Sequence, residues 1–169
     1  MDNSIHQQIL LKIQAIEPGT VLFTTDFMAE GTDDAIHKTL SRLVRQKLIN
    51  RLGKGIYLKP KYDAVVGPVL PSLELVARQI AANEQVVIRP TGSYALNKLG
   101  LSTQVPTKVV FLTNGSRRMI RIGKGTIHFK PTTPKKLAAE NEVVFLAIQA
   151  LITLGEKGTT DKVIHLLTN

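Results

Sequence analysis

The segment from residue 32 to residue 60 constrains the fold most, because it places an amphipathic helix directly before a short hairpin. Thr32 is placed to cap this helix, with Asp33 and Asp34 in its first turn, and we expect the helix to end near Leu48. Its apolar residues fall within about a third of a helical wheel and define a core face. They are Ile36, Leu40, Leu43 and Val44.

Two short strands follow this helix, at about residues 49–52 and 56–59, with Gly53-Lys54-Gly55 as the turn between them. Upstream, apolar residues at helical spacing predict a first helix from Ser4 to Ile16, capped by Asn3 or Ser4. A short extended piece comes next, and then a short helix through residue 29 with Thr24 and Thr25 as candidate caps. The order of helix, short helix, helix and hairpin predicts a winged helix-turn-helix domain over residues 1–64.

The outer face of the third helix is basic. Between Ala35 and Tyr62 the chain contains eight Lys or Arg residues and no Asp or Glu. Such charge suits the phosphate contacts that dominate nucleic-acid affinity, while short polar side chains and arginine can reach base edges. A basic surface helix without a ligand is the alternative interpretation. The predicted DNA-contacting residues are Thr25, Thr32, His37, Lys38, Ser41, Arg42, Arg45, Arg51 and Lys54.

The remainder of the chain predicts a second domain over residues 65–169, which gives an α+β fold class overall. The segment "VVGPVLPS" resembles a linker at the domain boundary. Asn114-Gly115 predicts a hairpin between the first two strands of a small antiparallel sheet, and Gly123-Lys124-Gly125 predicts a second turn. We expect helices at about 72–83, 91–100, 134–155 and 160–167, and strands at about 85–90, 108–113, 119–122 and 126–130.

Most of the net charge of +9 lies in this second half. Residues 67–169 carry thirteen Lys or Arg and six Asp or Glu, whereas residues 1–66 carry nine and seven. The densest cluster of basic residues in this half could bind nucleic acid, bind an acidic protein, or protect an edge strand against aggregation. This candidate second basic patch consists of Arg117, Arg118, Arg121 and Lys124.

One internal similarity links the two halves. "RLGKGIYLKP" begins at Arg51, and "RIGKGTIHFKP" begins at Arg121. We interpret them as two tight basic hairpins with the same turn chemistry, with an ancient duplication as the alternative.

Catalytic and metal-binding motifs are not recognisable in the sequence. There is no cysteine, which is compatible with a reducing cytoplasm, and the four histidines lack metal-ligand spacing. The glycine-rich segments fail the spacing of a phosphate-binding Walker loop. Gly92-Ser93 resembles the opening of a nucleotidyltransferase site, but no Asp lies between Asp63 and Asp161 to hold a metal ion. No apolar run is long enough to cross a bilayer. We therefore expect a cytoplasmic protein without a catalytic site, cofactor or metal.

Three phrases occur in order along the chain: "LINRLGKGIYLKP", "RPTGSYALNKLGL" and "TKVVFLTNGSRRMIRIGKGTIHFKP". In these phrases the sequence resembles the AbiEi-type antitoxins of bacterial type IV toxin–antitoxin systems and neighbouring bacterial regulators. The resemblance implies a DNA-binding repressor of its own operon. It also implies that the functional partner is a nucleotidyltransferase-like toxin. The antitoxin counters the effect of this toxin, and no stable complex between the two proteins is required. The antitoxin-like second domain looks shorter than a complete one.

The prediction is a sequence-specific regulator that binds double-stranded DNA, with a homodimer as a possible state and with no membrane partner. The alternative is a protein-interaction adaptor in which the winged helix and the basic hairpin bind an acidic protein. An RNA-binding protein is a weaker third interpretation, because only 5% of the residues are aromatic and single-strand readers use aromatic stacking.

Overall fold

The computed structural model describes residues 4–138 and 141–168. Its helices and strands form two compact units, residues 1–72 and residues 73–169, so the fold class is α+β as expected. The predicted boundary after residue 64 lies in the turn of a hairpin, formed by β4 (Lys61–Asp63) and β5 (Gly67–Val69). The Asp63 carboxylate closes this turn by accepting the N–H groups of Val65 and Val66. The segment expected to be a linker therefore contributes a strand.

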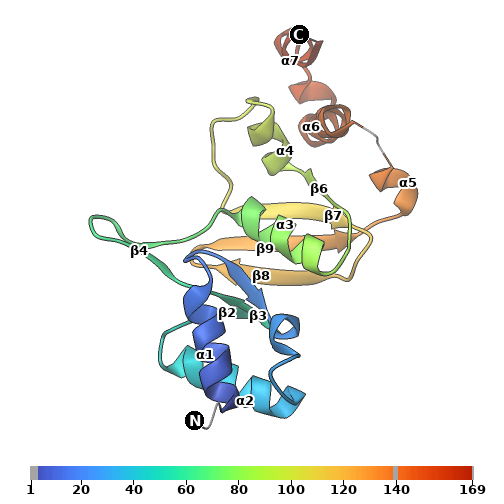
Figure 1. Ribbon diagram of the computed structural model, residues 1–169. Helices are drawn as coiled ribbons and strands as arrows, with labels where there is room; N and C mark the ends of the chain where they lie inside the picture. The colour runs from blue at the N-terminus through green and yellow to red at the C-terminus, as the bar shows by residue number, and fades with distance from the viewer. Residues whose placement is uncertain (1–3, 139–140, 169) are drawn as a thin grey trace. The chain divides into compact units, whose positions relative to one another are not determined.

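Unit 1 begins with two helices and a 3-10 helix, interrupted by one strand, and ends with four strands (Figure 1). Its three-stranded antiparallel sheet has the order β1-β3-β2, so the last strand lies in the middle. Before β4 the elements are α1 (Ile5–Ala15), β1 (Val21–Phe23), the 3-10 helix η1 (Thr24–Phe27), α2 (Asp33–Arg45), β2 (Asn50–Gly53) and β3 (Ile56–Leu58).

The helix starts of unit 1 differ in part from expectation. The Ser4 hydroxyl accepts the N–H of Gln7 and caps α1, while Asn3 lies outside the described residues. Thr24 and Thr25 are not caps, because they lie within η1. The Asp26 carboxylate instead accepts the Phe23 N–H at 2.7 Å, as a charged acceptor does more strongly than a hydroxyl.

The α2 helix ends three residues before the expected Leu48. Lys47 adopts a left-handed conformation with φ of 59°. The N–H of Leu48 then bonds to the Leu43 carbonyl, and the N–H of Lys47 bonds to the Val44 carbonyl. These two bonds form a Schellman motif, which stops the helix and turns the chain toward β2.

The core of unit 1 lies between α1, α2 and the sheet. Buried aliphatic side chains from both helices meet Phe27 of η1 and Tyr57 of β3. The core face predicted for α2 is confirmed for its three fully buried members, while Val44 is partly buried. Those three are Ile36, Leu40 and Leu43.

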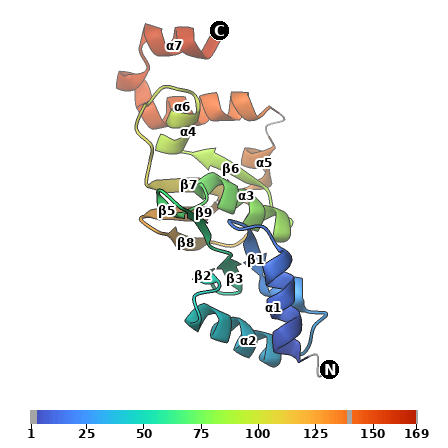
Figure 2. The same ribbon diagram turned by 60° about the vertical axis from the view of Figure 1, so that its left-hand side comes forward.

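Unit 2 is built on a four-stranded sheet of order β6-β7-β9-β8 (Figures 1 and 2). The predicted antiparallel pairing is confirmed for β6 with β7 and for β8 with β9, but β7 and β9 pair in parallel. The predicted Asn114-Gly115 hairpin is wrong, since β9 lies between the strands that this turn connects. The Asn114 side chain instead accepts the Val87 N–H at 2.8 Å. The strands are β6 (Ile88–Thr91), β7 (Lys108–Thr113), β8 (Arg118–Ile122) and β9 (Gly125–Pro131).

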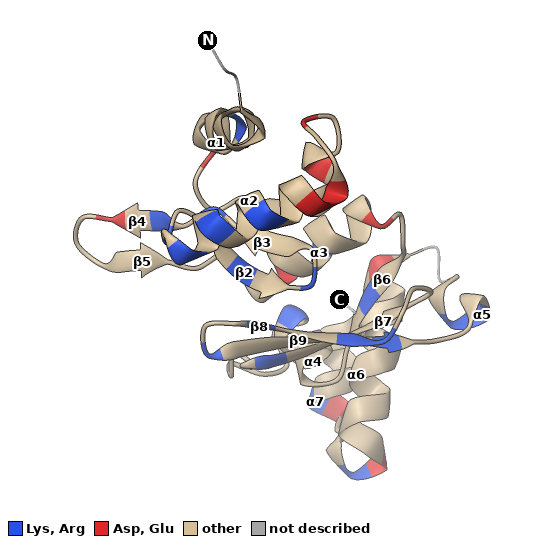
Figure 3. Cartoon of the chain, turned by 90° about the horizontal axis from the view of Figure 1, so that it is seen from below, with Lys and Arg blue, Asp and Glu red and all other residues tan. Residues whose placement is uncertain are grey.

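Helices lie on both sides of this sheet, which Figure 3 views nearly edge-on. One face carries the buried aliphatic and aromatic residues of the strands and is covered by α3 (Leu73–Asn83). Phe111 of this face also meets Tyr94 of α4 (Ser93–Lys98) edge to face. On the other side α6 (Glu142–Gly158) packs beside β6, where Gln149 lies against Thr91.

The C-terminal helical segment is divided, although one helix was expected from 134 to 155. It forms α5 (Pro134–Leu137), α6, which is kinked at Gly155 where the helix was expected to end, and then α7 (Asp161–Thr168). The Asn141 side chain starts α6 afresh by accepting the N–H groups of Val143 and Val144. Within the described residues, no helix is both long enough and apolar enough to traverse a bilayer.

Candidate nucleic-acid interface

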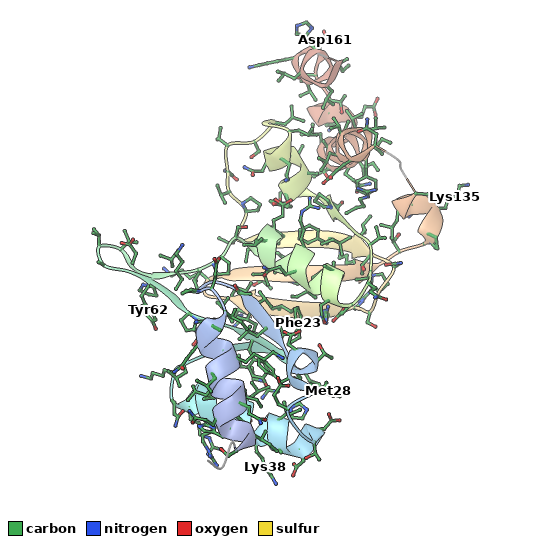
Figure 4. All side chains as sticks on the ribbon, in the orientation of Figure 1. Phe23, Met28, Lys38, Tyr62, Lys135 and Asp161 are labelled. Carbon is green, nitrogen blue, oxygen red and sulfur yellow. The ribbon has the colours of Figure 1, made fainter. Side chains whose placement is uncertain are left out.

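The exposed face of α2 gathers five of the predicted residues in one place. Their side chains project from successive turns of the helix, opposite the buried core face, and surround an open depression of about 390 Å³. The lining residues are His37, Lys38, Ser41, Arg42 and Arg45. Figure 4 shows Lys38 on the outer side of unit 1.

Charge on this face is mostly uncompensated. Arg42 and Arg45 form no ion pair with any residue of the described chain. Lys38 does pair with Asp34 one turn earlier, at 2.6 Å, and both side chains are about three-quarters exposed. An exposed pair of this kind contributes little to stability, so a phosphate could displace Asp34 at small cost.

The β2–β3 hairpin carries two more predicted residues. Lys54 is exposed in its two-residue turn, and Arg51 is exposed with its Nε donating to the Gly53 carbonyl at 3.2 Å. Gly55 has φ of 70°, and a Cβ there would also press on the Thr24 hydroxyl at 3.3 Å. Glycine is therefore required at this position. The Gly55 carbonyl accepts the N–H of Thr24 at 3.0 Å, which fixes the turn beside the start of η1.

The two threonines of the predicted set lie near α2 but contribute less directly. Thr32 occupies the N-cap position of α2 and is exposed, and its hydroxyl makes no capping bond. Thr25 is exposed on η1, eight residues before α2 begins. Of the two, only Thr32 lies at the N-terminal end of α2.

Lys59, counted among the eight basic residues, serves the fold instead. Its Nζ donates to the Gln14 carbonyl at 2.9 Å and also to the Ile16 carbonyl. These carbonyls lie at the C-terminal end of α1, where a cation is favourable to the helix dipole. One of the eight cations is thus already engaged within unit 1.

The candidate second patch is divided between the two faces of the sheet in unit 2. Arg118 points to the α3 side, where it pairs with Glu84 and lies 5.1 Å from the Phe129 ring centre. Arg121 alternates with it along β8 and is exposed on the opposite face, while Lys124 is exposed in the turn. Arg117 borders a depression of about 230 Å³ on which His128 also lies.

The exposed face of this sheet has basic residues that the sequence interpretation missed. Lys108 and Lys130 are both exposed on the same side as His128, because Lys108 pairs with Thr126 and because Thr126, His128 and Lys130 alternate along β9. Partial burial, followed by the charges of Lys108 and Lys130, lowers the pKa of His128. The signal for these residues was present as alternation along residues 126–130, but the assumed Asn114-Gly115 hairpin placed the strands in the wrong order.

The two similar hairpins do not share one turn. In the first, Gly53 pairs with Ile56 and the turn is Lys54-Gly55. In the second, Ile122 pairs with Gly125 and the turn is Gly123-Lys124, with φ of 56° at Gly123. The left-handed glycine is the last residue of Gly53-Lys54-Gly55 but the first residue of Gly123-Lys124-Gly125, so the prediction of the same turn chemistry is wrong.

A family model described as "Family of unknown function (DUF6088)" matches residues 8–169. The chain belongs to this family. The match to DUF6088 extends over both units, and the family description names no activity. A search of curated proteins finds no match. Among the described residues, no group of three or more His, Asp or Glu side chains is placed to hold a metal ion.

Proposed function

We propose that this protein is a transcriptional regulator that binds double-stranded DNA in a sequence-specific way through a winged helix-turn-helix in unit 1. In this proposal η1 and α2 form the helix-turn-helix, and the β2–β3 hairpin is the wing. The element order and the strand order β1-β3-β2 support the assignment. A helix preceded by a tight turn and followed by a hairpin is the arrangement with which such domains place one helix in the major groove.

The observation that carries the proposal is the exposed face of α2. Five polar or basic side chains surround one depression there, and its two arginines have no acidic partner among the described residues. In the docked state Ser41, His37 and Arg42 reach base edges, while Lys38 and Arg45 contact phosphates. Lys54 at the wing tip contacts the backbone beside the groove.

We further propose that the regulator is an autoregulating antitoxin of a type IV toxin–antitoxin system. The three sequence phrases that resemble the AbiEi-type antitoxins support this role. They fall on the β2–β3 hairpin, on β6 with α4, and on β7 to β9, so they come from both units. In this role the functional partner is a nucleotidyltransferase-like toxin that need not form a stable complex.

A titration of labelled duplex DNA from the protein's own upstream region tests DNA binding. We expect affinity to fall steeply with salt, with a slope of about 0.9 per phosphate contacted on a double-logarithmic plot. The variant Arg42→Ala/Arg45→Ala should bind on the order of 10- to 100-fold more weakly. Lys157→Ala/Lys162→Ala removes the same charge from the C-terminal helices, where both side chains are exposed, and should bind like wild type.

Equal binding by wild type and the arginine variant would refute the assignment of α2. A stable stoichiometric complex with the product of the adjacent gene, without any DNA binding, would instead favour the adaptor alternative. Circular dichroism of each variant separates lost contacts from lost structure, and all four substituted side chains are exposed.

A further inference from the structure

The sheet of unit 2 leaves part of one face uncovered on β7, β9 and β8. Strand pairing places three rows of side chains across this face. At one end, Lys108 and Arg121 both lie level with Thr126 of β9. At the other end, Lys130 lies beside Arg117 on the rim of the 230 Å³ depression.

The middle row has a different character. Val110 and Met119 both lie level with His128, so an imidazole stands between an aliphatic side chain and a thioether. Met119 is 59% exposed, so this row is accessible to a ligand. The cationic rows are separated by four residues of β9, or roughly 13 Å, and three strands span roughly 10 Å.

Negative charge is missing from this face. The four strands of the sheet contain no Asp or Glu. Neighbouring carboxylates are already paired: Glu84 pairs with Arg118, and both Glu74 and Glu142 pair with Arg78. In the described part of the chain, Lys108, Arg117, Arg121 and Lys130 form no ion pair. Their charge is therefore available to an anionic ligand.

We propose that this sheet face is a binding site for single-stranded nucleic acid, in which the outer rows hold phosphates and the middle row receives a base. Single-strand sites combine a positively charged path for the backbone with a ring on which a base stacks. Histidine rings and arginine planes are among the groups on which bases stack. Partial burial and the charges of Lys108 and Lys130 lower the pKa of His128, which favours the uncharged form of the ring for stacking. The proposal does not depend on the function proposed for unit 1.

An acidic peptide is the other polymer that such charges attract. Carboxylates would satisfy the two cationic rows but would leave the half-buried ring of His128 and the exposed thioether of Met119 without a matching group. A base fills that middle row while its flanking phosphates reach both outer rows. The arrangement therefore favours nucleic acid over an acidic protein.

The test uses fluorescein-labelled twelve-nucleotide U and dT oligomers, with the full-length Arg42→Ala/Arg45→Ala variant as the starting protein. Adding Arg121→Ala/Lys130→Ala should weaken binding on the order of tenfold, since two phosphate contacts are lost. Adding Lys157→Ala/Lys162→Ala removes the same charge elsewhere and should leave binding unchanged. His128→Ala should weaken binding by about fivefold or more, and His128→Phe should restore it.

The outcomes separate the possibilities. Tighter binding of the U oligomer identifies recognition of the 2′-hydroxyl, and equal binding assigns the face to single strands in general, so both support the proposal. Equal losses in the two double variants would overturn it, because binding would then follow net charge alone. Preference for a twelve-base-pair duplex, or competition by polyglutamate as strong as by unlabelled oligomer, would also overturn it.

Discussion

Replacing Glu74 by Gln should destabilise unit 2 in a pH-dependent manner. Glu74 lies on α3 and accepts hydrogen bonds from Arg78 on the same helix and from Tyr94 and Lys98 on α4. Burial alone would raise the pKa of Glu74, but the bonds from Lys98, Tyr94 and Arg78 outweigh it and lower the pKa to about 2. Burial, together with the hydrogen bond to the Glu74 carboxylate, raises the pKa of Tyr94.

The magnitude follows from linkage between protonation and folding. The fall in the pKa of Glu74 from 4.5 to about 2 corresponds to a contribution of at most about 3 kcal/mol to the free energy of unfolding. The Glu74 side chain is 21% exposed, so solvent screening reduces this to about 1–2 kcal/mol. Because the folded pKa lies below the unfolded value, the contribution is fully present above about pH 5.5 and disappears as the pH falls toward 2.

Thermal unfolding of wild type and Glu74→Gln at pH 7 and at pH 3 measures this contribution. A loss of 1 kcal/mol corresponds to about 4–8 °C for a unit of this size. We expect a clear difference at pH 7 that shrinks at pH 3, with faster amide exchange in α3 and α4. Equal stabilities at pH 7, or a difference that is as large at pH 3 as at pH 7, would refute the reasoning.

Two further substitutions test single features of unit 1. Lys59→Met should lower the free energy of unfolding by about 1–2 kcal/mol, because α1 loses a cation that caps its last carbonyls. Duplex affinity should change by no more than about twofold in that variant, since a cation bound within unit 1 is no phosphate contact; a tenfold loss would place Lys59 at the interface. Lys47→Gly should raise the free energy of unfolding by about 1 kcal/mol, because φ at this position is 59°. Chemical denaturation measures both effects, and a destabilised Lys47→Gly protein would show that the side chain outweighs the backbone strain.

Local signals predicted much of unit 1. The periodicity of α1 and α2 and the glycine turn of the β2–β3 hairpin act over a few residues, so the sequence determined these elements closely. The roles of individual side chains were harder to predict. The engagement of Lys59 with the end of α1 joins residues more than forty positions apart, and no local pattern reports such a contact.

The sheet of unit 2 shows the limit of local reasoning. Asn-Gly is a strong hairpin signal, yet the Asn114 side chain accepts a hydrogen bond from the Val87 N–H. The turn connects β7 to β8, and these two strands are not neighbours because β9 lies between them. Strand order depends on which apolar faces pack together, which is a property of the whole unit. The cationic rows on the uncovered face follow from that order, so they could be recognised only in the structure.

An NMR titration of the isotope-labelled protein with its own upstream duplex tests the central claim most directly, since it locates contacts residue by residue. The proposed function predicts that the largest amide shifts fall on α2, around Lys38 to Arg45, and on the hairpin turn at Lys54. It also predicts that these shifts reverse as salt is raised. Unchanged α2 amides at a saturating duplex concentration would contradict the account, whatever happens elsewhere in the chain.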